Sequence, residues 1–162
     1  MITQDEIVSI GKGSPVNINW ELVSHCQFNC SYCYYRPFKS DTKYDVLSKI
    51  ILKKISSITD DTQVSLLGGE PSLHPCFHDV VKSLYNMGNV ENINIVTNFV
   101  KPLEFWKKLE PFRDKIKIVI SYHPEYTKSN IFEKIGLLKN DFKLDFVFIV
   151  HNDLKFLEKM NS

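Results

Sequence analysis

Segments patterned as β-strands alternate with segments patterned as α-helices from Val16 to the end of the chain, at intervals near the ~30 residues of one βαβ step. The five expected strands are residues 16–22, 63–67, 93–97, 116–121 and 144–150. Five such units joined by right-handed crossovers predict an α/β fold, with a parallel sheet that has its helices outside and curls toward a barrel. A complete eight-unit barrel takes ~250 residues, so this length predicts an open partial (β/α) barrel of about five units.

The segments between the strands carry the apolar stripes and end signals of amphipathic helices. The first two expected helices are residues 43–58 and a segment from Phe77 that stops near Gly88. The third has Pro102 at its first position, and the fourth is opened by Asn130 and Glu133 as a capping-box pair. A short helical stub is expected at 154–160. No linker or low-complexity segment interrupts the series. We therefore expect residues 1–162 to form a single domain, with residues 1–13 as a lead-in.

The first expected strand alternates strictly between apolar and polar residues. Val16, Ile18, Trp20 and Leu22 share one face, whereas Asn17, Asn19 and Glu21 share the other. Because a buried parallel strand is usually apolar on both faces, the polar face predicts that the inside of the curved sheet is wet and functional.

The charge balance bears on the choice of partner. The formal net charge is +1, with basic and acidic residues interspersed, so nothing favours nucleic acid as a partner. No run of eighteen apolar residues predicts a membrane span, and the first residues do not resemble a secretion signal. We therefore expect a cytoplasmic protein, whose crowded cysteines hold metal rather than form disulfides.

Cys26, Cys30 and Cys33 follow the first strand with the spacing Cys-x3-Cys-x2-Cys. Thiolate ligands select iron–sulfur clusters, zinc or copper(I), and a structural zinc ion would need a fourth ligand nearby. His25 could serve zinc only with awkward geometry, and Cys76 reads as a small structural residue at the start of a helix. In a cubane cluster, three thiolates would leave one iron open to another ligand.

The segment from Cys26 to Cys33, with Tyr32 before the last cysteine, resembles the signature of the radical S-adenosylmethionine (radical SAM) superfamily. The resemblance implies a [4Fe–4S] cluster held by the three cysteines. It also implies that the open iron binds the amino and carboxylate groups of S-adenosylmethionine, and that Tyr32 packs near its adenine.

Later loops extend the resemblance. Gly68-Gly69-Glu70 resembles the superfamily's Gly-Gly-Glu motif, which receives the methionine amino group; taken alone it reads as a turn with a surface carboxylate. Glycines also let a backbone approach a ligand closely. Asn98 and Ser121 end the third and fourth strands, where relatives place groups near the methionyl carboxylate and the ribose. Val150 would touch adenine through its backbone, although the superfamily's usual adenine motif is not visible there. His123-Pro124-Glu125 and His151 are candidates on the substrate side.

The activity implied by the resemblance is reductive cleavage of S-adenosylmethionine to methionine and a 5′-deoxyadenosyl radical, which takes hydrogen from a substrate. The favoured hypothesis is a peptide or protein substrate, with small-molecule chemistry left open. An external one-electron reductant similar to flavodoxin or ferredoxin would be required, and a large substrate or second subunit would act as a lid. Two alternative hypotheses remain: a non-catalytic iron–sulfur electron-transfer protein and a zinc-binding interaction domain.

Overall fold

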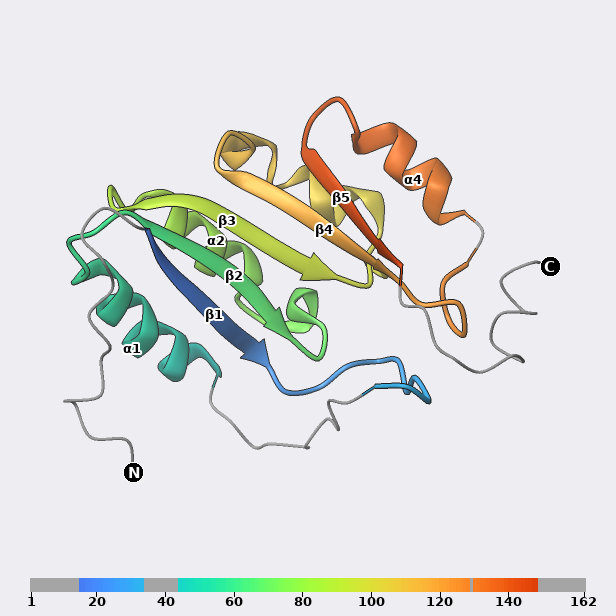
Figure 1. Cartoon of the computed structure of the whole chain (residues 1–162), viewed down its shortest axis with the longest axis horizontal. Helices are drawn as coiled ribbons and strands as arrows, with labels where there is room; N and C mark the ends of the chain where they lie inside the picture. Colours follow the sequence, from blue (N-terminus) through green and yellow to red (C-terminus); the bar gives the residue numbers. More distant parts are fainter. Residues whose placement is uncertain (1–14, 34–43, 129, 149–162) are drawn as a thin grey trace.

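The computed structural model describes residues 15–33, 44–128 and 130–148, which form a five-stranded parallel sheet (Figure 1). The strands are β1 (Val16–Val23), β2 (Thr62–Gly68), β3 (Val90–Thr97), β4 (Ile116–Tyr122) and β5 (Lys143–Phe148). They lie in the order β1-β2-β3-β4-β5, so each strand pairs with its neighbour in sequence. This confirms the expected α/β fold, which resembles part of a (β/α) barrel.

Helices connect the strands. They are α1 (Tyr44–Ser56), α2 (Phe77–Tyr85), α3 (Leu103–Lys107) and α4 (Ile131–Leu138), with short 3-10 turns η1 (Pro71–Leu73) and η2 (Glu110–Phe112). In the view of Figure 1, α2 lies behind β2 and β3. Because every crossover steps to the next strand in the same direction, right-handed connections put the helices on one face of the sheet.

The core lies between that face and the helices. The alternate strand residues that point toward the helices are mostly apolar; they are largely buried in β2, β3 and β4 and only partly buried in β5. In β1, Trp20 and Leu22 are buried and Val16 and Ile18 are partly buried, which confirms the predicted apolar face. The strand residues in this core are Trp20, Leu22, Val64, Leu66, Val90, Ile93, Ile95, Ile116, Ile118 and Ile120, and the helices supply Ile55, Phe77, Val80, Val81, Leu84, Trp106, Ile131 and Leu138.

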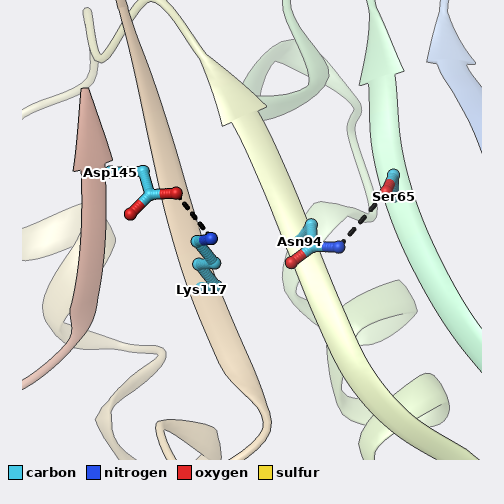
Figure 2. A network of polar contacts seen from close by, with 4 residues as sticks. All are labelled: Ser65, Asn94, Lys117 and Asp145. Carbon is cyan, nitrogen blue, oxygen red and sulfur yellow. Dashed lines mark hydrogen bonds and ion pairs between the residues drawn. The ribbon is translucent and has the colours of Figure 1, made fainter. Parts of the chain in front are cut away.

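The opposite, inner face of the sheet is polar over much of its length. Asn94 donates from Nδ2 to Ser65 Oγ across β2 and β3 (3.3 Å), and Lys117 Nζ lies 2.5 Å from Asp145 Oδ2 across β4 and β5 (Figure 2). On β1 the polar residues of the alternating pattern are exposed. The helices leave this face uncovered in the part of the chain described, as the alternation in β1 predicts.

One predicted helix start is shifted by a residue, and one predicted capping contact is absent. Pro102 lies at the N-cap of α3, because its ψ of 159° is extended and the helix begins at Leu103. Asn130 is the N-cap of α4, but its side chain makes no capping hydrogen bond. Its φ and ψ of −72° and 0° differ from the extended backbone with which a capping side chain reaches the first turn, so the predicted pair with Glu133 does not form.

Several expectations lie outside the described residues: the 1–13 lead-in, Val150, His151 and the 154–160 stub. Within the described residues, no helix has both the length and the apolar content needed to cross a bilayer.

Candidate functional site

A cavity of about 900 Å³ opens at the edge of the sheet where the strands end. Loops following β1, β2, β3 and β4 surround it, since parallel strands bring their carboxyl ends to one edge. Nine of the ten predicted site residues line this cavity: Cys26, Cys30, Tyr32, Cys33, Gly68, Gly69, Glu70, Asn98 and Ser121. The tenth, Val150, lies outside the described residues. The structure therefore brings the predicted set together, while the role of each residue stays a prediction.

The cysteine loop, residues 24–33, is irregular apart from bends and one turn at residues 31 and 32. Phe28 donates its backbone N–H to Cys26 Sγ (3.4 Å), and Cys33 donates its backbone N–H to the Cys30 carbonyl (3.1 Å). Cys26 and Cys30 are partly buried and Cys33 is exposed. Burial raises the pKa of the Cys26 and Cys30 thiols, with the negative charge of nearby carboxylates adding to the effect.

The three cysteines are all part of the cavity lining. Among the described residues, no group of three His, Cys, Asp or Glu side chains lies close enough together to hold a single metal ion. Three soft sulfur donors beside an open cavity fit an iron–sulfur cluster that leaves room for another ligand. Cys76 is absent from the cavity lining and stands at the N-cap of α2, consistent with its predicted structural role.

The two glycines after β2 are required by their contact with the end of β1. A Cβ on Gly68, whose φ is +129°, would lie 2.1 Å from the Val23 carbonyl oxygen, and a Cβ on Gly69 would lie 2.2 Å from the His25 carbonyl oxygen. Gly69 donates its N–H to the Val23 carbonyl (2.9 Å). The missing side chains thus allow this loop to pack against the start of the cysteine loop, a reason the sequence alone did not reveal.

Glu70 is almost fully buried, at 1% exposed, and its carboxylate joins two loops. Oε1 accepts from Ser72 N–H (3.1 Å), Ser72 Oγ (2.5 Å) and Thr97 Oγ1 (2.7 Å), while Oε2 accepts from Asn98 N–H (2.8 Å). Burial raises the pKa of Glu70, and these four donors oppose that shift. The side chain therefore ties the end of β2 to the end of β3.

Asn98 carries that connection on to the cysteine loop. Its Nδ2 donates to Cys26 Sγ (3.5 Å), and its Oδ1 accepts from Gln27 Nε2 (3.0 Å). The next residue, Phe99, has a φ of 57°, uncommon for a side chain of this size, and its N–H donates to Thr97 Oγ1 (2.9 Å). Its ring stacks on buried Trp106, with centroids 4.9 Å apart, so packing holds the turn that presents Asn98.

His123 lies beside the cysteines. Its Nδ1 is 3.0 Å from Tyr32 Oη and 3.5 Å from Cys30 Sγ, and its ring is parallel to that of Tyr32. Burial lowers the pKa of His123, and burial together with the hydrogen bond to Cys30 raises the pKa of Tyr32. The sequence placed His123 among substrate-side candidates. In the structure His123 both contacts the cysteine loop and lines the cavity, so its substrate-side role stays a prediction.

Comparison with known proteins gives a family and a fold. Residues 11–135 match the family described as the 4Fe–4S single cluster domain. Over 94 residues the chain is 27% identical to the GTP 3′,8-cyclase of Haemophilus influenzae (strain 86-028NP), covering 54% of this chain and 28% of that enzyme. The GTP 3′,8-cyclase of Microcystis aeruginosa is also 27% identical, over 85 residues that cover 48% of this chain and 25% of that enzyme.

Two solved structures share the fold. BtrN in complex with AdoMet and 2-DOIA superposes with a TM-score of 0.65 at 21% identity, covering 87% of this chain and 58% of that one. Native anSMEcpe with bound AdoMet and Cp18Cys peptide superposes with a TM-score of 0.63 at 16% identity, covering 82% of this chain and 42% of that one. The chain thus spans about half the length of these proteins and about a quarter of the length of the cyclases.

Proposed function

Because this chain belongs to the 4Fe–4S single cluster domain family, within the radical SAM superfamily that its cysteine spacing resembles, we propose that it binds S-adenosylmethionine and cleaves it reductively. The observation that carries the proposal is the lining of one cavity by three thiols together with the Gly-Gly-Glu, Asn98 and Ser121 groups. A volume of about 900 Å³ lies within the range of small-molecule and cofactor sites.

Cys26, Cys30 and Cys33 would hold the cluster. When bound and reduced, such a cluster supplies the electron that divides S-adenosylmethionine into methionine and a 5′-deoxyadenosyl radical. The protein's part is to bind, orient and shield the reactants. Asn98 donates to Cys26 Sγ, and Tyr32 and His123 lie within hydrogen-bonding distance of each other beside Cys30, so polar groups already surround two of the three sulfurs.

The methionine end of the cofactor fits the loop after β2. Since the Glu70 carboxylate already accepts four hydrogen bonds, we assign recognition of the ammonium group chiefly to backbone carbonyls of this loop. Glu70 then keeps the ends of β2 and β3 together, and adds negative charge beside a cationic group. Ser121 lines the cavity from the end of β4, where it would meet the ribose, and Val150 would contact the adenine.

A peptide or protein is the proposed substrate. The inner face of the sheet carries side-chain amides and hydroxyls, among them Asn17, Asn19, Ser65 and Asn94, and these groups match the alternating donors and acceptors of a peptide backbone. One protein of the same fold, anSMEcpe, was solved with a peptide. Others of similar sequence or fold act on or bind small molecules, so product analysis decides between the classes.

Two partners complete the proposal. An external one-electron reductant resembling flavodoxin or ferredoxin would reduce the cluster, and a large substrate or second subunit would cover the open side of the barrel and exclude water. A cytoplasmic location, where thiols stay reduced, belongs to the same proposal.

The test is anaerobic. Protein reconstituted with iron and sulfide should be brown, and after reduction with dithionite it should release 5′-deoxyadenosine and methionine in equal amounts from S-adenosylmethionine. Cys30→Ala should do neither, and Cys76→Ala should do both, because Cys76 lies outside the cavity lining. Incubation with a peptide library, read by mass spectrometry, then identifies the product.

Other outcomes favour the alternative hypotheses. A brown protein that releases no 5′-deoxyadenosine would be an electron-transfer protein. A colourless protein that retains zinc after reconstitution would be a zinc-binding domain. Either result would overturn the proposed activity.

A further inference from the structure

The loop after β4, residues 123–127, is a compact turn held by its own hydrogen bonds. His123 donates its backbone N–H to Thr127 Oγ1 (2.9 Å), and its carbonyl accepts from the N–H groups of Tyr126 (2.9 Å) and Thr127 (2.7 Å). The side chains of residues 123, 125 and 126 therefore project from a fixed backbone, and all three contact the cysteine loop.

Glu125 binds the turn that separates two of the cysteines. Its Oε2 accepts from the backbone N–H of Ser31 (3.0 Å), and its Oε1 accepts from Ser31 Oγ (2.5 Å). Ser31 is the second residue of the four-residue turn closed by the hydrogen bond between Cys33 N–H and the Cys30 carbonyl. One carboxylate thus fixes the backbone between the two thiols.

Tyr126 holds the preceding part of the same loop. Its Oη donates to the Asn29 carbonyl (2.9 Å), and its ring stacks on Phe28, with centroids 4.8 Å apart and planes 15° apart. The contacts made by Glu125 and Tyr126 therefore cover Phe28, Asn29 and Ser31, which lie between the cysteines.

We propose that residues 123–127 are a clamp that fixes the cysteine loop in its cluster-binding shape before the cluster arrives, with Glu125 and Tyr126 as positioning residues. The inference rests on the proposed function only in requiring a cluster on the three cysteines. The clamp reaches the loop from a strand that does not adjoin β1, since β2 and β3 lie between them in the sheet. Preorganised ligands lose less conformational entropy on binding, so the clamp strengthens cluster retention.

The charge of Glu125 and its positioning role predict opposite effects on cluster binding when the side chain is removed. A carboxylate beside the thiols opposes the thiolate form electrostatically, so its removal alone would favour cluster binding. Positioning predicts the opposite, because a thiol held in the wrong place binds poorly. If loss of Glu125 weakens cluster binding, the cause is therefore the lost positioning of the cysteine loop, because the lost negative charge alone would strengthen binding.

The first experiment uses the metal-free protein. In Glu125→Ala, the hydrogen-bonded amides of Phe28, Ser31 and Cys33 should exchange hydrogen about tenfold faster than in wild type, the factor expected for a lost hydrogen bond to a charged group that is partly exposed. Tyr126→Phe, which keeps the ring and removes the hydroxyl, should give a smaller increase. The matched control is Glu91→Ala, an exposed carboxylate at the opposite end of β3, which should leave this exchange unchanged.

The second experiment measures how fast a chelator removes iron from the reconstituted proteins. Glu125→Ala should lose iron about 10- to 100-fold faster than wild type, the range for residues that orient metal ligands. Glu125→Gln, which keeps one acceptor oxygen for Ser31, should recover part of the loss, and Glu91→Ala should match wild type. Urea unfolding identifies any variant that fails to fold. If Glu125→Ala fails, the same exchange and iron-release measurements on the more conservative Glu125→Gln, Ser31→Ala and Tyr126→Phe test the clamp.

Unchanged exchange and unchanged iron release in the folded Glu125 variants would overturn the clamp. Different results would refute the proposed cleavage of S-adenosylmethionine and the proposed clamp. If wild-type protein holds its cluster but releases no 5′-deoxyadenosine, the proposed activity is refuted. The clamp can still be tested in that case by comparing iron release from wild type and the Glu125 variants. A wild-type protein that takes up no cluster overturns both.

Discussion

The loop that ends β2 and the loop that ends β1 meet at one edge of the sheet, but they are held by different means. The first is fixed by glycines packed against backbone and by the buried carboxylate of Glu70. The second is largely on the surface and is held by side chains, among them those of Asn98, Glu125 and Tyr126. We expect changes in the first loop to alter the stability of the fold and changes in the second to alter cofactor binding.

The largest expected effect on the free energy of unfolding comes from Glu70→Ala. It leaves Thr97 Oγ1, Ser72 and the Asn98 N–H without their acceptor in a buried place. We expect a loss of about 3–5 kcal/mol in the metal-free protein, measured by urea unfolding. A loss below about 1 kcal/mol would remove the contrast between the two loops.

Gly69→Ala should follow, with a loss of about 2–4 kcal/mol, because the added Cβ would meet backbone atoms of His25 that cannot simply rotate away. Gly88→Ala is the matched control, since nothing lies within 4 Å of a Cβ at that position. Equal stability of the two variants in urea would show that the close approach of the loops is relaxed at little cost.

A smaller effect should appear in the pH dependence of stability. Burial raises the pKa of Glu70 in the folded state, so the folded protein holds a proton that the unfolded chain has already released. Stability should therefore fall as pH rises from the unfolded pKa, about 4.5, through the raised folded value. Glu70→Gln cannot ionise and should lack this component when the two proteins are unfolded in urea across pH 4 to 8. Parallel curves would contradict the assignment.

The smallest expected effect on folding comes from Cys33→Ser, whose side chain is exposed. We expect a change within about 0.5 kcal/mol in the metal-free protein, as for most surface substitutions. The same change should abolish retention of an intact cluster, measured as iron and sulfide per chain after desalting. A variant that keeps both would show that this thiol is not a ligand.

Local pattern was enough to predict the sheet and the cysteine loop. The alternation in Val16 to Leu22 survives in β1 because it follows from which face is buried. The direction of the Glu70 carboxylate could not be predicted in the same way, since two of its partners, Thr97 and Asn98, come from the next strand. The capping-box prediction failed because a residue pattern does not fix the backbone angles at Asn130.

The role of the loop after β4 needed the fold itself. Glu125 and Ser31 are 94 residues apart, and no periodicity links them. In sequence, His123 and Glu125 are an isolated polar pair after a strand, which suggested groups facing a substrate. Their contacts with Cys30 and Ser31 depend on the fold, which brings the loop after β4 to the cysteine loop. Figure 1 shows the strand order that separates β4 from β1.

That separation along the chain also sets an order of events during biogenesis. Contacts between distant residues form late because a long loop must first be closed. On a ribosome, the three cysteines emerge well before the segment that contacts them, so the nascent loop would be an imperfect receptor for iron. With the proposed clamp, we therefore expect the cluster to bind after residues 123–127 have been synthesised and have folded against the cysteine loop.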